Sequence, residues 1–225
     1  MSISQAKKSR QVSSSQKTVH PGLEKVIQRH MQSEWRGRLH QPTVEMFNVL
    51  NKLVSDLNPG SIILDSGCGT GLSSRQLGDL YPDSLIVGVD KSTSRLAVPG
   101  IDESPNIRGN VILARMELAS FWRLVVSAQW SVQRHYLLFP NPWPKSGHLL
   151  RRWHGHPAWP VLIELGGLLE MRCNWEVYAR EFATALELSG KSAHLAPLFP
   201  GPVISLFEQK YRASGHDLWV VTSAL

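Results

Sequence analysis

The chain has 225 residues, of which 42% are hydrophobic and 19% are charged. This composition is too apolar for a disordered chain and contains no apolar stretch of membrane-spanning length, so we expect a single globular domain over residues 21–225. The formal net charge of +6 is concentrated at the N-terminus, where residues 1–40 hold eight Lys and Arg against two Glu. Such a basic segment favours a polyanionic partner.

The first 20 residues are dominated by Ser, Gln, Lys and Arg. They predict a flexible basic arm, and because no apolar stretch follows the charges they argue against a cleaved secretory signal. The two cysteines, Cys68 and Cys173, have neither C-x-x-C spacing nor partners spaced as metal ligands. We therefore expect a cytoplasmic protein with reduced thiols, no metal and no membrane contact. The sequence does not indicate the oligomeric state, for which a monomer is the expectation.

The first predicted elements form a strand–helix–strand unit. Apolar residues at three- and four-residue steps predict a helix over 43–57, which Asn-Pro-Gly at 58–60 ends. A short β-branched stretch then predicts a buried strand ending at Asp65, followed by a G-x-G-x-G turn at 67–71. A helix over 73–80 and a second buried strand over 85–89, ending at Asp90, complete the unit, whose strands should be parallel.

The alternation of strands and helices continues to the C-terminal half. We predict strands near 111–113, at 135–139 and around 167–171, with a helix over 175–188. These elements predict an α/β fold in which a doubly wound, mostly parallel sheet has helices on both faces.

Ligands of such sheets bind beyond the carboxyl ends of the strands, so Asp65, the glycine turn and Asp90 should share one crevice. Glycines let the backbone approach a ligand closely, and an acid ending the second strand can accept hydrogen bonds from a ribose. A carboxylate just before the glycines would repel a pyrophosphate but would suit the α-amino group of S-adenosylmethionine. Glu117, after the third strand, receives the adenine amino group or fixes the loop around it, with an ordinary acid at a helix start as the alternative. The predicted cofactor-binding residues are Asp65, Gly67, Gly69, Gly71, Asp90 and Glu117.

A window without carboxylates extends over residues 118–163 and contains five Lys and Arg. Within it, alternating prolines stiffen the loop 141–145 and hold Asn141 and Trp143 in fixed directions. The amide of Asn141 suits reading a base edge, and the ring of Trp143 suits stacking on a base. The pair Arg151-Arg152, which follows beside aromatic residues, indicates binding of phosphate together with base.

These motifs resemble the bacterial tRNA guanine-N7 methyltransferases, from about residue 36 to the C-terminus. The likeness rests on Arg-Gly-Arg at 36–38, the strand and glycine turn at 63–71, Asn-Pro-Trp-Pro-Lys at 141–145 with Arg151-Arg152, residues 172–179, and Phe-Glu at 207–208 before Gly-His at 215–216. The resemblance implies a Rossmann-like class I S-adenosylmethionine-dependent methyltransferase that acts on tRNA. It assigns Asn141 to the catalytic position and assigns tRNA binding to Lys145, Arg151, Arg152, Asn174, Ser205 and Glu208.

The chain departs from the family pattern at three of these positions. Where the family usually has aspartate, this chain has Asn141 and Asn174, and Ser205 stands in place of a threonine. Because guanine N7 already carries a free lone pair, methyl transfer to it needs orientation rather than a general base, and the changes could lower the rate or move the target without abolishing binding. Glu208 is expected to accept from guanine, with a solvated helix acid as the alternative.

Three other functions remain open at this point. Asn-Pro-Trp resembles the Asn/Asp-Pro-Pro-aromatic loop of methylases that act on exocyclic amines, although the second proline is missing. Loss of two carboxylates would also fit a non-catalytic protein that binds cofactor or RNA. A nicotinamide oxidoreductase is disfavoured by Asp65.

Overall fold

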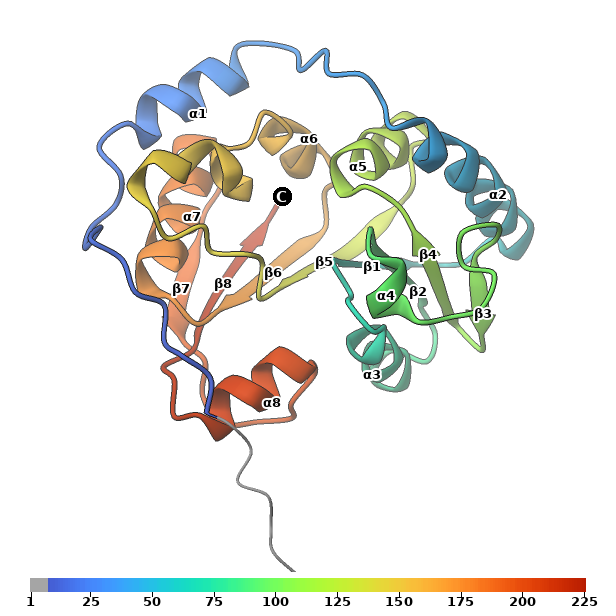
Figure 1. The fold of residues 1–225 in the computed structure, drawn as a ribbon. Helices are drawn as coiled ribbons and strands as arrows, with labels where there is room; N and C mark the ends of the chain where they lie inside the picture. The colour runs from blue at the N-terminus through green and yellow to red at the C-terminus, as the bar shows by residue number, and fades with distance from the viewer. Residues whose placement is uncertain (1–7) are drawn as a thin grey trace, which may run out of the picture.

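The computed structural model describes residues 8–225, so residues 1–7 of the predicted arm lie outside the described residues. Within 8–225 the chain forms an eight-stranded sheet in the order β3-β4-β2-β1-β5-β6-β8-β7 (Figure 1). The central strands β4, β2, β1, β5 and β6 are parallel to one another, whereas β3, at one edge, and β8 run antiparallel to their neighbours. The strands are β1 (Ile62–Ser66), β2 (Leu85–Asp90), β3 (Asn106–Arg108), β4 (Val111–Arg115), β5 (Val132–Leu138), β6 (Leu168–Cys173), β7 (His194–Pro197) and β8 (Trp219–Ala224).

Helices cover both faces of this sheet. In Figure 1, α1, α2, α5, α6 and α7 lie on the upper face, and α3 and α8 lie on the lower face. Each face has its own hydrophobic core, because the buried residues of β1, β2 and β4 alternate between the two sides. The helices are α1 (Leu23–Met31), α2 (Gln41–Leu57), α3 (Leu72–Leu80), α4 (Thr93–Leu96), α5 (Leu118–Ser127), α6 (Trp159–Glu164), α7 (Glu176–Leu188) and α8 (Leu206–Ala213).

The structure confirms the predicted doubly wound sheet, with bounds that differ by a few residues. The strands predicted from apolar stretches correspond to β1, β2, β4, β5 and β6. Sequence analysis did not predict the shorter strands β3 and β7, or β8, which inserts antiparallel between β6 and β7. No helix within residues 8–225 is both long and apolar enough to cross a bilayer.

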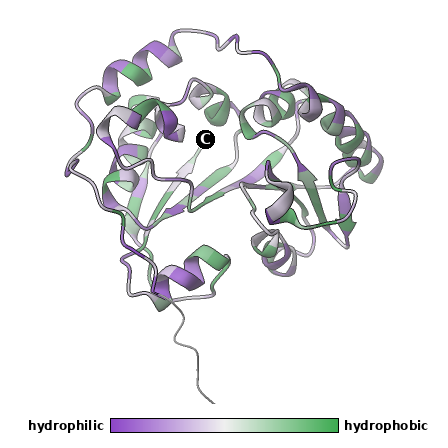
Figure 2. Cartoon of the chain, in the orientation of Figure 1, coloured by the Kyte–Doolittle hydropathy of each residue, from purple (hydrophilic) through white to green (hydrophobic). Residues whose placement is uncertain are grey.

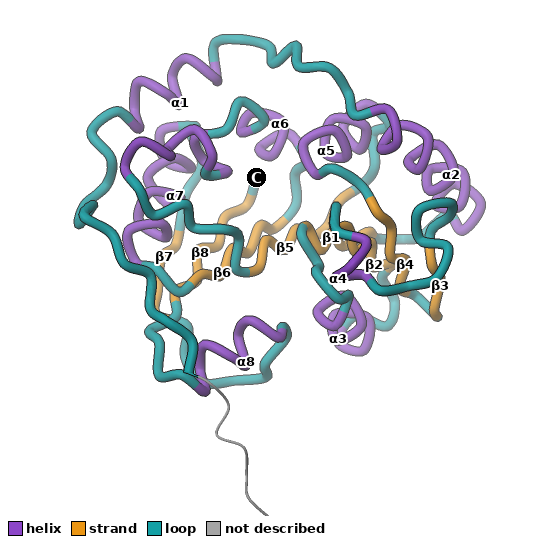
Figure 3. Tube along the Cα trace, in the orientation of Figure 1, coloured by secondary structure: helices purple, strands orange, loops and turns teal. Residues whose placement is uncertain are grey.

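Residues 8–20, which we call the N-terminal strap, contain neither helix nor strand but lie against the rest of the protein. Figure 3 shows this segment as a continuous loop before α1, and in Figure 1 it runs from α1 past α7 to α8. At its start, the Ser9 amide donates to Ser214 Oγ at 2.9 Å, and further on Gln16 and His20 bond to Glu181. Residues 8–20 thus pack against the main body through polar groups, unlike the flexible arm that their composition leads one to expect.

Candidate methyltransferase site

The glycine turn lies directly after β1 and has a backbone that favours glycine. Gly67, Gly69 and Gly71 have φ values of 81°, 59° and 72°. At Gly71 a Cβ atom would also lie 2.5 Å from Leu113 Cδ1, so the position excludes a side chain for two reasons. The amides of Gly67 and Cys68 both donate to the carbonyl of Val89, which fixes the turn to the end of β2.

Asp65, in β1, is 1% exposed and has one fully paired oxygen and one unpaired oxygen. Its Oδ2 accepts from Ser73 Oγ at 2.6 Å and from Ser74 Oγ at 2.7 Å, whereas its buried Oδ1 has no hydrogen-bond partner within the described chain. Burial raises the pKa of this carboxyl to about 6, although the two serines oppose the rise. An unpaired buried acceptor of this kind suits a cationic donor. The two serines open α3, a partnership that sequence analysis missed.

Asp90 ends β2 and is also buried, but both of its oxygens have partners. Oδ2 accepts from the Gly69 amide at 3.0 Å and Oδ1 accepts from the Ser92 amide at 2.8 Å. Arg95 lies 3.3 Å from Oδ2, and its side chain is 56% exposed. Asp90 therefore shapes the glycine turn through its bond to the Gly69 amide.

A cavity of about 350 Å³ lies between the glycine turn and the start of α8. This volume is within the range of small-molecule sites. Figure 2 shows that the start of α8 is hydrophobic while the rest of the helix is mostly polar. The cavity is lined by Gly67, Cys68, Gly69, Thr70, Leu72, Ser73, Arg95, Leu138, Ser205, Leu206, Phe207 and Lys210. Sequence analysis had assigned none of Arg95, Phe207 and Lys210 to the site.

Glu117 is a helix cap in this structure. Its two oxygens accept from the amides of Ala119 and Ser120, at 2.9 and 2.8 Å, at the start of α5. The structure thus shows the acid at a helix start, and the contact with adenine stays a prediction, since each carboxylate oxygen can accept a second hydrogen bond. Both carboxylate oxygens are engaged with backbone groups of their own helix.

The loop 141–145 leaves the carboxyl end of β5, beside the cavity wall formed by Leu138. Asn141 is exposed, and its Oδ1 accepts from the Trp143 amide at 3.3 Å. The guanidinium of Arg151 lies 4.9 Å from the ring centre of Trp143. Lys145 and Arg151 are exposed. The polar groups of Asn141, Lys145 and Arg151 are therefore exposed to solvent, although none of the three residues lines the cavity.

Arg152 was predicted to bind RNA, but its side chain is 0% exposed. It forms an ion pair with Glu181 of α7, and it also donates to the carbonyls of Trp143 and Lys145 at 3.1 and 3.2 Å. Its guanidinium lies 5.0 Å from the ring centre of Trp175, which is itself buried. Arg152 has no surface for a phosphate, so its predicted role is corrected from RNA binding to support of the loop 141–145.

Glu208 is also 0% exposed, and both of its oxygens are paired with arginines. Oε2 lies 2.7 Å from Arg172 Nη1, and Oε1 lies 2.8 Å from Arg212 Nη2. The predicted contact with guanine is corrected because no oxygen is free, and the alternative of a solvated acid is wrong as well. Ser205 accepts from the Glu208 amide at 3.1 Å and so caps α8.

The topology brings several predicted residues together. Ser205 lines the same cavity as Gly67 and Gly69 although it is far away in sequence. Asn141 and Asn174 follow the neighbouring parallel strands β5 and β6, so both lie at the carboxyl edge of the sheet. Asn174 Nδ2 is 3.1 Å from Nδ1 of His216. Within residues 8–225, no three His, Cys, Asp or Glu side chains are grouped as metal ligands.

The sheet order, the glycine turn after β1 and the acid ending β2 define a Rossmann-like class I methyltransferase fold. Solved structures support this class. An antibiotic-related methyltransferase aligns with a TM-score of 0.54 at 14% identity, covering 78% of this chain and 94% of its own. A point mutant of the 16S rRNA (adenine(1408)-N(1))-methyltransferase from Catenulisporales acidiphilia, solved with cosubstrate SAM, aligns with a TM-score of 0.53 at 17% identity, covering 77% and 90%.

The family follows from the sequence over most of the chain. Residues 59–221 match the model of the family described as "Putative methyltransferase", and the chain belongs to this family. A tRNA (guanine-N(7)-)-methyltransferase of Alcanivorax borkumensis is 26% identical over 180 residues, covering 72% of this chain and 74% of the relative. Another, from Stutzerimonas stutzeri, is 28% identical over 167 residues, covering 68% of each. These relatives confirm the resemblance inferred from the motifs.

Proposed function

We propose that this protein transfers a methyl group from S-adenosylmethionine to N7 of a guanine in tRNA, acting in the cytoplasm as a monomer. The observation that carries the proposal is the cavity between the glycine turn and α8, whose wall includes the last residue of β5. The loop with Asn141 and Trp143 starts from that wall, so the cofactor and target-base sites adjoin.

S-adenosylmethionine would supply the methyl group, bonded to its sulfonium. The residues around the glycine turn suit such a ligand, because the unpaired Oδ1 of Asp65 can accept from a cationic amino group. The positive-φ glycines allow close approach of the ligand to the backbone, and Asp90 would accept hydrogen bonds from a ribose in exchange for its ion pair with Arg95. Leu206 and Phe207 of α8 supply an apolar wall opposite the turn.

The exposed residues of the loop 141–151 suit the RNA. Trp143 offers a face for the target base, and Asn141 offers an amide that is neutral near the cation formed on methylation. Lys145 and Arg151 are free to contact phosphates. Guanine N7 needs no proton removed, so the chain's task at this site is to hold the base in line with the methyl group and to exclude water.

The proposal is tested by incubating purified protein with methyl-labelled S-adenosylmethionine and unmodified tRNA, then locating the label. A matched tRNA transcript carrying 7-deazaguanosine in place of guanosine is the control, because it lacks the N7 acceptor. We expect label at guanine N7 in the first RNA and none in the second. Label on an exocyclic amine, or cofactor binding without transfer to any RNA, would contradict the proposal.

A further inference from the structure

Glu181, in α7, is the centre of a buried polar cluster that lies outside the cavity. Its side chain is 0% exposed and contacts two residues of the segment after η1 (Ser146–Arg151). It pairs with Arg152 Nη1, and its Oε2 is 2.9 Å from His154 Nε2. Burial opposes the charge of Glu181, but the hydrogen bonds and charges of His154 and Arg152 outweigh burial and lower the pKa of this carboxyl to about 2.

Through Arg152, this cluster determines the position of the loop that carries Asn141. Arg152 Nη2 donates to the carbonyls of both Trp143 and Lys145, and Nε also donates to Trp143. Three prolines surround these residues, so the loop has few amides with which to form hydrogen bonds of its own. The donors on Arg152 therefore replace the backbone hydrogen bonds that a sheet or helix would provide.

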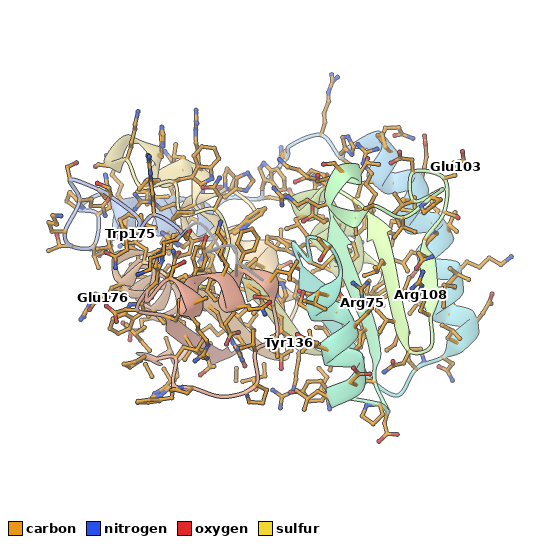
Figure 4. The ribbon with its side chains drawn as sticks, turned by 60° about the horizontal axis from the view of Figure 1, so that its bottom comes forward. Arg75, Glu103, Arg108, Tyr136, Trp175 and Glu176 are labelled. Carbon is orange, nitrogen blue, oxygen red and sulfur yellow. The ribbon has the colours of Figure 1, made fainter. Side chains whose placement is uncertain are left out.

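The N-terminal strap joins the same cluster through Gln16. Its Nε2 donates to Glu181 Oε1 at 2.6 Å, and its Oε1 accepts from Arg152 Nη2 at 3.0 Å. Two residues earlier, Ser14 Oγ donates to the carbonyl of Pro144. The His20 amide donates to Glu181 at 2.9 Å. Figure 4 shows Trp175 and Glu176 at the start of α7, the helix that carries Glu181.

The other end of the strap is bound to the turn between α8 and β8. His216 Nε2 is 3.1 Å from the Ser9 carbonyl, and its Nδ1 is 3.1 Å from Asn174 Nδ2. An amide nitrogen can only donate, so Nδ1 accepts and Nε2–H donates to Ser9. The strap thus connects the loops that follow β5 and β6, which carry Asn141 and Asn174.

We propose that Gln16 and Glu181 are positioning residues for methyl transfer, and that the strap couples the loops after β5 and β6. This inference rests on the proposed function for its effect on rate, whereas the coupling itself is a property of the free protein. The strap contributes through the uncharged side chain of Gln16, which bonds to Glu181 and Arg152, a role separate from any attraction of its lysines and arginines to RNA.

The test compares Gln16→Ala with Gln11→Ala. Both changes remove the same side chain from the strap and leave the net charge unchanged, but Gln11 is exposed and makes no hydrogen bond within residues 8–225. In Gln16→Ala, Arg152 and Glu181 stay paired, so the protein should remain folded. Calorimetry with S-adenosylmethionine then measures the cofactor affinity and the fraction of folded sites in each variant.

We expect faster hydrogen exchange of the amides in 141–152 for Gln16→Ala, with cofactor affinity and stoichiometry as in the wild type. We also expect kcat on tRNA to fall about tenfold while KM for tRNA changes little, because misplacing the base lowers the rate without removing a phosphate contact. Gln11→Ala should match the wild type in every measurement.

Unchanged exchange in Gln16→Ala would overturn the coupling, and faster exchange with wild-type kcat would overturn the positioning role. A wild-type protein that methylates no tRNA would refute the proposed function instead. The exchange measurement uses no RNA, so it would still decide whether the strap holds the loop 141–145.

Discussion

Arg151 and Arg152 are adjacent in sequence but have opposite environments. The guanidinium of Arg151 is exposed and lies over the ring of Trp143, whereas that of Arg152 is fully buried against Glu181. Because the chain at this point is a short 3₁₀ turn, consecutive side chains point to different sides. Removal of Arg151 should therefore affect tRNA binding, whereas removal of Arg152 should affect the stability of the fold.

Arg151→Ala is expected to weaken tRNA binding and leave stability unchanged. Each lost phosphate contact should lower the slope of log affinity against log salt by about 0.9. Filter binding of tRNA over a range of salt concentrations measures this slope. Arg108→Ala is the matched control, because Arg108 is exposed on β3 at the edge of the sheet. An equal change in both variants would show that Arg151 acts through net charge alone.

Arg152→Ala and Glu181→Ala are each expected to lower the free energy of unfolding by about 3–5 kcal/mol, because each leaves a buried charge without its partner. Urea unfolding followed by tryptophan fluorescence measures this loss. The double variant Arg152→Met with Glu181→Leu should recover part of it, since it leaves neither charge buried. If the double variant lost as much free energy of unfolding as the two single variants together, the other hydrogen bonds of the cluster would dominate.

Asp65 should make cofactor binding depend on pH. Its folded-state pKa of about 6 means that the carboxyl becomes neutral as the pH falls through 6, so affinity for S-adenosylmethionine should decrease there. Asp65→Asn should bind at least about tenfold more weakly at pH 8, where a hydrogen bond to a charged group is lost, and should not show this pH dependence. Calorimetry at pH 5 to 8 measures both. A wild-type affinity that is constant over this range would contradict the assignment.

Ionisation of the Asp65 carboxyl should lower the stability of the folded protein, whereas ionisation of an acid whose pKa falls on folding raises it. Because its pKa is raised on folding from 3.8, the folded state binds the proton more tightly, and the contribution of Asp65 to stability decreases as the pH rises from about 4 to 6. Asp65→Asn lacks this decrease, so the stability of the ligand-free variant relative to the wild type should increase as the pH rises from about 4 to 6. Urea unfolding without cofactor checks the sign.

Asn141→Asp is expected to raise turnover on tRNA several-fold, because a carboxylate can accept from the Trp143 amide as the present amide does and can also stabilise the cation formed on guanine. Asn174→Asp should raise turnover as well. Single-turnover rates with saturating cofactor measure the effect, and unchanged or slower transfer in both variants would count against weakened guanine contacts.

The sequence alone determined the parallel core of the sheet and the place of the glycine turn. Apolar stretches such as 62–64 and 85–89 are local patterns, and positive-φ glycines occur where the turn requires them, so neither depends on distant residues. The same reasoning missed β8, whose antiparallel position between β6 and β7 depends on residues brought together from distant parts of the chain.

Only the tertiary structure decided which charged groups are available to ligands. Arg152 and Glu208 have sequence contexts that are typical of RNA-binding and base-reading residues, yet both are buried against partners 29 and 36 residues away. The strap was likewise expected to be flexible, since its composition does not reveal that Gln16 meets Glu181, 165 residues further on. Burial of a charge depends on what packs around it, and packing is set by contacts between distant segments that no local pattern encodes.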